Sequence, residues 1–232
     1  MIDHMGSFRI FADRCEAGRW LAAHLPRERL RGPVLLALPR GGVPVGREIA
    51  AVLDAELDVL LVRKLGAPLN PELAVGAVAS GGVTVYNRDV MRQLGLDERD
   101  LDRVRERELA ELRRRERVYR GSRPPPAVRD RSVILVDDGV ATGATMEAAI
   151  SAVRQLGPAE VIVAVPTAAA DAAWRLRRLA DGMVCAATPE PYIAVGAWYR
   201  SFPQLSDEEV VALLESASRE RRERASGGEA PG

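Results

Sequence analysis

Two adjacent carboxylates, Asp137 and Asp138, separate an apolar run from a stretch of small residues within residues 133–146. The apolar run, residues 133–136, predicts a strand that is buried on both faces. After the small residues, apolar side chains recur at helical spacing, at Met146, Ala149, Ile150 and Val153. The carboxylates are therefore expected at the carboxyl end of a strand, beside the N-terminus of the next helix.

The turn between this strand and this helix could form an anion site. Its small residues leave backbone N–H groups accessible, and the partial positive charge of a helix N-terminus attracts a phosphate. Thr142 and Thr145 add hydroxyl donors. Because Asp137 and Asp138 would repel phosphate oxygens, we expect them to bind vicinal hydroxyls of the same ligand. A ribose 5-phosphate has this layout.

The run 133–146 strongly resembles the signature of type I phosphoribosyltransferases. The resemblance implies that Asp137 and Asp138 hold the ribose hydroxyls of phosphoribosyl pyrophosphate. It also implies a loop that holds the 5-phosphate, formed by Ala141, Thr142, Gly143, Ala144 and Thr145. Gly139 departs from the apolar residue that usually follows the acidic pair. The competing interpretation is an ordinary strand-to-helix turn whose aspartates cap the helix.

A second glycine turn follows the strand predicted at residues 34–38 and precedes a helix predicted at 45–53. In this turn Arg40 supplies a positively charged fork, and Gly41 and Gly42 allow the backbone to approach an anion closely. The resemblance implies that these three residues form the pyrophosphate-binding loop, which is often held in a strained peptide geometry. Alone, the Gly-Gly pattern favours a plain tight turn, and it indicates an anion site only together with residues 133–145.

Lys64 is the only lysine among 33 basic residues. Its compact ammonium group can act as a point charge on a phosphate where a planar guanidinium would not fit. It follows a strand predicted at residues 57–62, and ligands bind at the carboxyl ends of strands in open parallel sheets. The resemblance implies contact with pyrophosphate or base. The alternative is a solvated lysine without a function.

Three aromatic residues, Trp198, Tyr199 and Phe202, fall within five positions near the end of the chain. They could stack on a flat heteroaromatic base. The resemblance implies that a small hood, here about residues 189–217, covers that base. Packing of this segment against the core or another subunit is the alternative.

Alternating strand and helix patterns predict an α/β fold, a mainly parallel sheet flanked by helices. Further strands are expected at residues 161–165 and 183–187, with a helix at 169–179 between them. A hairpin is expected from residues 73–79 and 83–86, followed by a long surface helix capped by Asp97. The resemblance implies that the insertion at about 65–131 carries a mobile flap. We expect one domain over residues 1–217, a last helix at 206–214 and a disordered tail at 218–232.

The composition and the missing motifs argue against several classes of function. Basic and acidic residues balance at 33 each, which argues against binding nucleic acid through a general positive field. The two cysteines lack metal-ligand spacing, no apolar stretch could span a membrane, and we expect a cytoplasmic protein. The histidines, His4 and His24, lie far from every motif, which disfavours a Ser-His-Asp hydrolase. No nucleoside-triphosphatase loop, dinucleotide fingerprint or nucleophile elbow occurs.

The resemblance therefore implies transfer of ribose 5-phosphate from phosphoribosyl pyrophosphate to a nitrogen nucleophile, such as a nucleobase, with release of pyrophosphate. The catalytic candidates are Asp137, Asp138, Lys64 and Arg40. A Mg²⁺ ion would be held through the substrate, without a direct protein ligand. No convincing general base is visible, and a homo-oligomer is possible. The rival hypothesis is a regulatory protein that senses phosphoribosyl pyrophosphate without transferring it.

Overall fold

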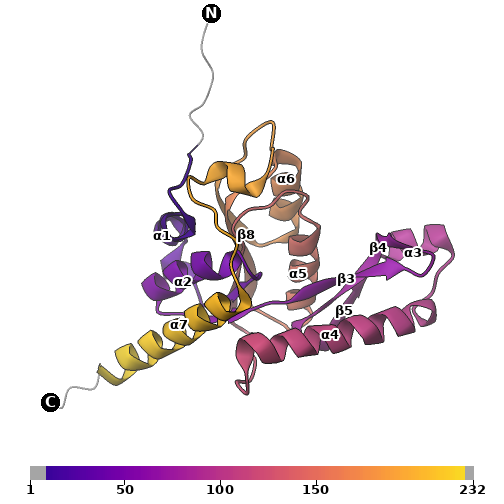
Figure 1. Cartoon of the computed structure of the whole chain (residues 1–232), viewed down its shortest axis with the longest axis horizontal. Helices are drawn as coiled ribbons and strands as arrows, with labels where there is room; N and C mark the ends of the chain where they lie inside the picture. The colour runs from indigo at the N-terminus through magenta and orange to yellow at the C-terminus, as the bar shows by residue number, and fades with distance from the viewer. Residues whose placement is uncertain (1–8, 228–232) are drawn as a thin grey trace, which may run out of the picture.

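The computed structural model describes residues 9–227 and contains two sheets with helices packed around them (Figure 1). The five-stranded sheet has the order β2-β1-β6-β7-β8, and the three-stranded sheet has the order β3-β4-β5. The strands are β1 (Val34–Ala37), β2 (Glu56–Val59), β3 (Val62–Ala67), β4 (Asn70–Ala79), β5 (Val83–Tyr86), β6 (Ser132–Val136), β7 (Glu160–Thr167) and β8 (Gly182–Ala187). The helices are α1 (Arg14–His24), α2 (Gly42–Leu53), α3 (Arg88–Leu94), α4 (Asp102–Arg120), α5 (Ala144–Arg154), α6 (Ala170–Leu179) and α7 (Asp207–Gly227).

All strand pairs of the larger sheet are parallel, as the alternating sequence pattern predicts. Figure 1 shows α1 and α2 on one side of this sheet and α5 and α6 on the other. Successive side chains of a strand point to opposite faces, so both faces of the central strands must be apolar. In β6, Ile134 joins the core that contains α1 and α2, and Leu135 joins the core that contains α5.

The three-stranded sheet is antiparallel and forms an arm with α3 and α4 that extends away from the parallel core (Figure 1). The predicted hairpin is confirmed by the pairing of β4 with β5. The predicted long surface helix is confirmed as α4, which is mostly polar and buries Leu112 and Tyr119. Asp97 lies further upstream than the start of α4, and its carboxylate accepts hydrogen bonds from the N–H groups of Arg99 and Asp100.

The strand predicted at residues 57–62 is wrong, because the chain leaves the parallel sheet within it. The N–H of Leu60 still donates to Ala37 of β1, but Leu61 exchanges hydrogen bonds with Ser80 at the end of β4. β2 therefore ends at Val59, and Val62 begins β3. As a result, Lys64 lies within the antiparallel sheet, not at the carboxyl end of a parallel strand.

The predicted disordered tail is wrong for residues 218–227, since α7 continues to Gly227. Contacts with the core explain the extra length: Glu220 pairs with Arg47 of α2 at 2.6 Å, and Arg224 pairs with Asp54 at 2.9 Å. Residues 228–232, where the rest of that prediction falls, lie outside the described residues, as does His4.

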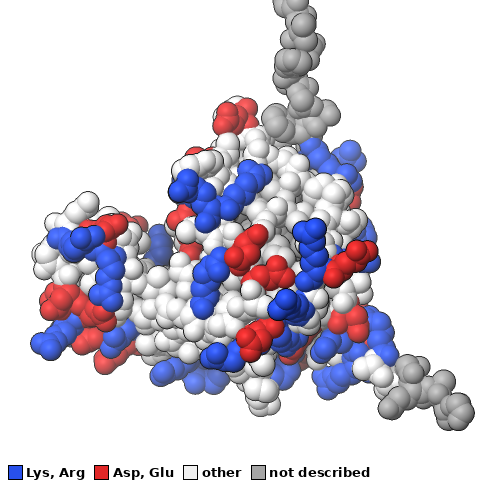
Figure 2. Space-filling model, turned by 180° about the vertical axis from the view of Figure 1, so that it is seen from behind, with Lys and Arg blue, Asp and Glu red and all other residues white. Residues whose placement is uncertain are grey.

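The surface charge agrees with the balanced composition. Figure 2 shows basic and acidic side chains intermixed over the face that it presents. Among residues 9–227, no helix is both long enough and apolar enough to cross a membrane.

Candidate functional site

The two glycine turns that sequence analysis singled out meet at the carboxyl edge of the parallel sheet. Strand β1 pairs with β6 in a register that sets Ala37 opposite Val136, so the turns that follow these strands are neighbours. A Cβ atom added to Gly41 would overlap the carboxylate of Asp138, and one added to Gly42 would lie 2.5 Å from the Val136 carbonyl oxygen. Only glycine therefore allows these two turns to approach so closely. The peptide bond between Pro39 and Arg40 is cis.

Asp138 is held by a residue that sequence analysis missed. The Arg14 Nε atom donates to the Asp138 carboxylate at 2.8 Å, and Arg14 Nη1 donates to the carbonyl oxygen of Pro203 at 2.8 Å. The Arg14 guanidinium also lies over the Phe202 ring, 3.8 Å from its centroid. Arg14 is a buried residue at the start of α1, 124 positions before Asp138, and no local spacing signals such a contact.

Asp137 lies in a different environment. Its Oδ1 atom accepts a hydrogen bond from the backbone N–H of Asp138 at 2.9 Å. Burial, together with the neighbouring charge of Asp138, raises the pKa of Asp137 well above its ordinary value. The helix-capping interpretation is wrong, because the N-cap position of α5 is Gly143 and no side chain caps it. Neither carboxylate therefore serves as a cap of α5.

The predicted 5-phosphate loop leads directly into α5. Gly143 has φ of 83°, a left-handed conformation that favours glycine, and Ala144 begins the helix. Ala141, Thr142, Ala144 and Thr145 are exposed. Because the first N–H groups of a helix have no intrahelical acceptor, this end of α5 can donate to an anion.

Arg175 of α6, which sequence analysis also missed, forms hydrogen bonds with this loop and with α5. Its Nη2 atom donates to the Thr142 carbonyl oxygen at 2.6 Å, and its Nε atom donates to Glu147 of α5 at 2.8 Å. These contacts fix the loop without occupying the first N–H groups of α5. In the sequence, Arg175 is one of several basic side chains on the helix predicted at residues 169–179, and nothing local indicates a contact with the loop.

The two predicted basic residues, Arg40 and Lys64, have different neighbours. Arg40 is half exposed beside Gly41, and its Nη1 atom lies 3.8 Å from the Asp207 carboxylate. Lys64 lines a cleft of about 460 Å³ together with Thr145 of the 5-phosphate loop and with Arg63 and Arg107. The Arg40 side chain thus points to Asp207, while its neighbour Gly41 lies against Asp138, and Lys64 shares a cleft with Thr145 of the predicted 5-phosphate loop.

The aromatic residues lie in the segment after β8, and Tyr199 contacts the backbone of Asp138. The Tyr199 hydroxyl donates to the Asp138 carbonyl oxygen at 2.5 Å, and its ring stacks on Phe202 with centroids 5.0 Å apart. Burial is the main cause of a raised pKa of Tyr199. Tyr199 is 6% exposed, so it packs against the core, whereas Phe202 is 36% exposed. Trp198 lies against Tyr192, with ring centroids 6.1 Å apart.

The same segment explains why a glycine follows the acidic pair. A Cβ atom at position 139 would lie 2.6 Å from a Val195 methyl carbon and 3.1 Å from the Tyr192 hydroxyl. That hydroxyl lies 3.2 Å from Thr167 Oγ1 at the end of β7. Val195 and Tyr192 thus occupy the space that an apolar side chain at position 139 would fill.

Within residues 9–227, no group of three or more His, Cys, Asp or Glu side chains could hold a metal ion. A hard cation at this site would therefore need oxygen ligands from a bound substrate or from water in addition to the acidic pair.

Comparisons with known proteins agree with this geometry. A family model described as the phosphoribosyl transferase domain matches residues 16–185. A Mycobacterium tuberculosis H37Rv protein named "Putative phosphoribosyl transferase" is 47% identical over 212 residues, which cover 91% of this chain and 48% of that protein. The crystal structure of TT1426 from Thermus thermophilus is 48% identical, with a TM-score of 0.82, and the match covers 89% of this chain and 98% of that one. The chain spans about half the length of the curated relatives it matches.

Proposed function

The chain belongs to the type I phosphoribosyltransferase family, and we propose that it transfers ribose 5-phosphate from phosphoribosyl pyrophosphate to a nitrogen nucleophile, a nucleobase or similar heterocycle. The observation that carries this proposal is the position of Asp137 and Asp138 beside an exposed phosphate loop at the N-terminus of α5. A ligand with a phosphate and a vicinal diol fits both parts at once.

In the proposed reaction the bond between the anomeric carbon and pyrophosphate breaks, and its electron pair leaves with pyrophosphate. The acceptor nitrogen forms the new bond to that carbon and loses a proton to solvent. The ribose gains positive charge between these events, and Asp137 and Asp138 orient its hydroxyls and offset that charge. The reaction needs no covalent protein nucleophile, so positioning carries most of the catalysis.

Arg40, Gly41 and Gly42 would hold the pyrophosphate, because their turn lies beside Asp138. Lys64 would add positive charge to a phosphate from the cleft that it shares with Thr145. A cation beside Asp137 would favour its ionised form and so counteract burial and the charge of Asp138, which raise the pKa of Asp137. Mg²⁺ held through the substrate would neutralise negative charge on the leaving pyrophosphate.

Replacement of both carboxylates tests this mechanism. The Asp137→Asn/Asp138→Asn variant should lose transfer by about 100-fold or more, because the positioning of the ribose hydroxyls is lost. Pyrophosphate release should be measured with a panel of purines, pyrimidines and their analogues, which also identifies the acceptor. Asp89→Asn, which alters an exposed carboxylate of α3, is the matched control and should retain full activity. Undiminished turnover in a correctly folded double variant would refute the mechanism.

A further inference from the structure

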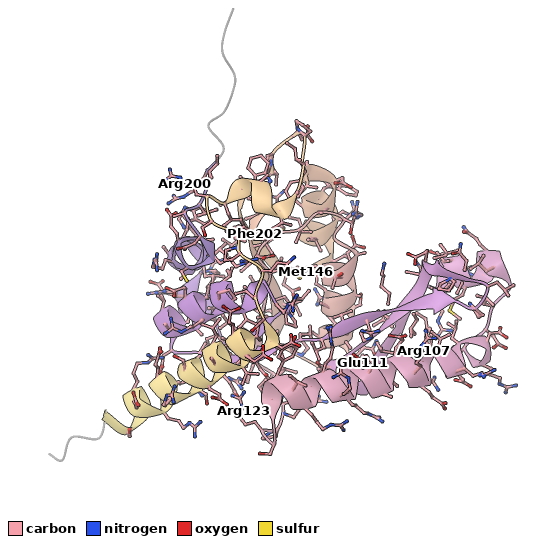
Figure 3. The ribbon with its side chains drawn as sticks, viewed as in Figure 1. Arg107, Glu111, Arg123, Met146, Arg200 and Phe202 are labelled. Carbon is pink, nitrogen blue, oxygen red and sulfur yellow. The ribbon has the colours of Figure 1, made fainter. Side chains whose placement is uncertain are left out.

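A second cleft, of about 360 Å³, opens beside β2, the outer strand of the parallel sheet. It lies where the end of α4 approaches α7, and Figure 3 labels Arg123 at this end of α4. Its charged residues are Glu56, Asp58, Arg120, Arg123, Arg221 and Arg222. None of its lining residues belongs to the two loops proposed to bind phosphoribosyl pyrophosphate, and its volume falls within the usual range for small-molecule sites.

Both carboxylates of this cleft already have arginine partners. Asp58 accepts from Arg120 Nε at 2.6 Å, and both side chains are buried. Arg120 also donates to the Val59 carbonyl oxygen, which fixes it against the edge of the sheet. Glu56 pairs with Arg131, which lies outside the lining, at 3.3 Å. Each acidic residue that lines the cleft therefore has an arginine partner, and Arg120 also pairs with Glu116 at 3.4 Å.

Three arginines of the cleft form no salt bridge with a carboxylate among residues 9–227. Arg123 donates to the carbonyl oxygens of Tyr119 and Arg120 at the end of α4. Arg221 and Arg222 of α7 donate to backbone carbonyl oxygens, and Arg222 also donates to a serine hydroxyl. Three positive charges around one cleft repel each other, and their remaining guanidinium N–H groups can serve an acceptor.

We propose that this cleft binds a compact phosphate-bearing anion, of the size of pyrophosphate or a sugar phosphate. Guanidinium groups match phosphate oxygens in pairs, which makes arginine well suited to this class of ligand. No aromatic side chain lines the cleft, so the ligand is recognised by its phosphate groups and not by a stacked base. Such an anion offsets the repulsion between Arg123, just beyond α4, and the two arginines of α7, and it links the end of the arm to the C-terminal helix.

Titration calorimetry of the full chain with inorganic pyrophosphate, in buffer of physiological ionic strength, tests this site. The Arg221→Gln/Arg222→Gln variant should lose one pyrophosphate site or bind there roughly tenfold or more weakly, as expected for charged hydrogen bonds. Arg177→Gln/Arg219→Gln removes the same charge from exposed positions of α6 and α7 outside the cleft. This control should bind like the unmodified chain.

Two outcomes would overturn the proposal. One is an isotherm of the Arg221→Gln/Arg222→Gln variant that coincides with that of the unmodified chain. The other is equal weakening in both double variants, which would show a general effect of surface charge. Arg123→Gln provides a check from the other wall of the cleft, and it should weaken the same site while α7 stays unaltered.

Discussion

At the scale of single residues, Arg14 is the main addition that the structure makes to the site. It connects α1, the carboxylate of Asp138 and the segment that contains Pro203 and Phe202. Because its contacts lead to the acidic pair and not to the phosphate loop, we regard it as a positioning residue. Its effect on a ligand would pass through the orientation of Asp138.

We predict that Arg14→Met destabilises the fold by about 3 kcal/mol, because removing one partner of a largely buried ion pair leaves the other charge uncompensated. Urea unfolding measures this loss. A matched control on the same helix is Arg19→Met, whose pair with Glu48 is mostly exposed on the Arg19 side and is worth about 0.5 kcal/mol or less. Similar losses in the two variants would contradict the structural role of Arg14. In the folded fraction, the KM for phosphoribosyl pyrophosphate should rise.

Asp137 gives a prediction about pH. Its raised pKa means that the folded chain holds this proton more tightly than the unfolded chain does. The pKa of Asp137 is about 3.9 in the unfolded chain and higher in the folded chain. As pH rises through this interval, ionisation of Asp137 therefore lowers the free energy of unfolding. Asp137→Asn lacks this loss, so its stability relative to the unmodified chain should increase with pH over that interval. Urea unfolding at a series of pH values measures the difference.

Asp171 of α6 is a control of opposite sign. Its hydrogen bond with Arg175 lowers the pKa of Asp171, so its ionised form favours the folded state. The stability of Asp171→Asn relative to the unmodified chain should therefore fall as pH rises through the acid range. If both variants show the same pH trend, the assignment of the raised pKa to Asp137 is wrong.

At the scale of elements, α7 differs most from its sequence-based prediction. Valines and leucines in its first half, such as Val210 and Leu214, are buried against the core, and its polar second half is fixed by ion pairs with α2 and the turn after it. A polar composition alone suggests disorder, because it cannot bury enough apolar surface. Ion pairs with Arg47 of α2 and with Asp54 keep this polar segment helical.

The second half of α7 can be tested with one variant. Glu220→Gln should lower the free energy of unfolding by about 0.5 kcal/mol, since the pair with Arg47 is partly exposed. Glu223→Gln, an exposed position on the same helix, should have no measurable effect. Hydrogen exchange should also show protected amides near residue 220. Rapid exchange throughout residues 218–227 would support the disordered tail and contradict the helix.

At the scale of the whole molecule, the parallel core carries the proposed site, and the antiparallel arm adds Lys64 and its cleft. Arginine is abundant, but acidic residues accompany it over the surface that Figure 2 shows. On α4, Arg114 pairs with Glu111 and Arg105 pairs with Asp102. Long-range attraction to nucleic acid requires a surplus of positive charge, which this chain does not have.

We therefore predict no retardation of a duplex DNA or a single-stranded RNA in a gel-shift assay, with or without phosphoribosyl pyrophosphate. The charge balance of 33 basic and 33 acidic residues is the physical reason. This assay separates the transferase from the rival regulatory function. A shift that depends on phosphoribosyl pyrophosphate, combined with no release of pyrophosphate, would favour a sensor.

The sequence by itself determined the parts of the protein in which neighbouring residues carry the information. The apolar run, the acidic pair and the small-residue turn of residues 133–146 are contiguous, so strand, carboxylates and phosphate loop could be predicted together. The alternation of strands and helices likewise predicted the parallel sheet and its flanking helices, because both patterns are local and periodic.

Only the tertiary structure decided which distant residues meet. Arg14 reaches Asp138 and Arg175 reaches Thr142 through the packing of α1 and α6, and neither contact leaves a periodic signal in the chain. The division between β2 and β3 depends on hydrogen bonds to Ala37 and Ser80, and the apolar run across residues 57–62 looks the same in either sheet. Contacts between residues distant in sequence thus determine where β2 ends, how long α7 is and which residues surround the acidic pair.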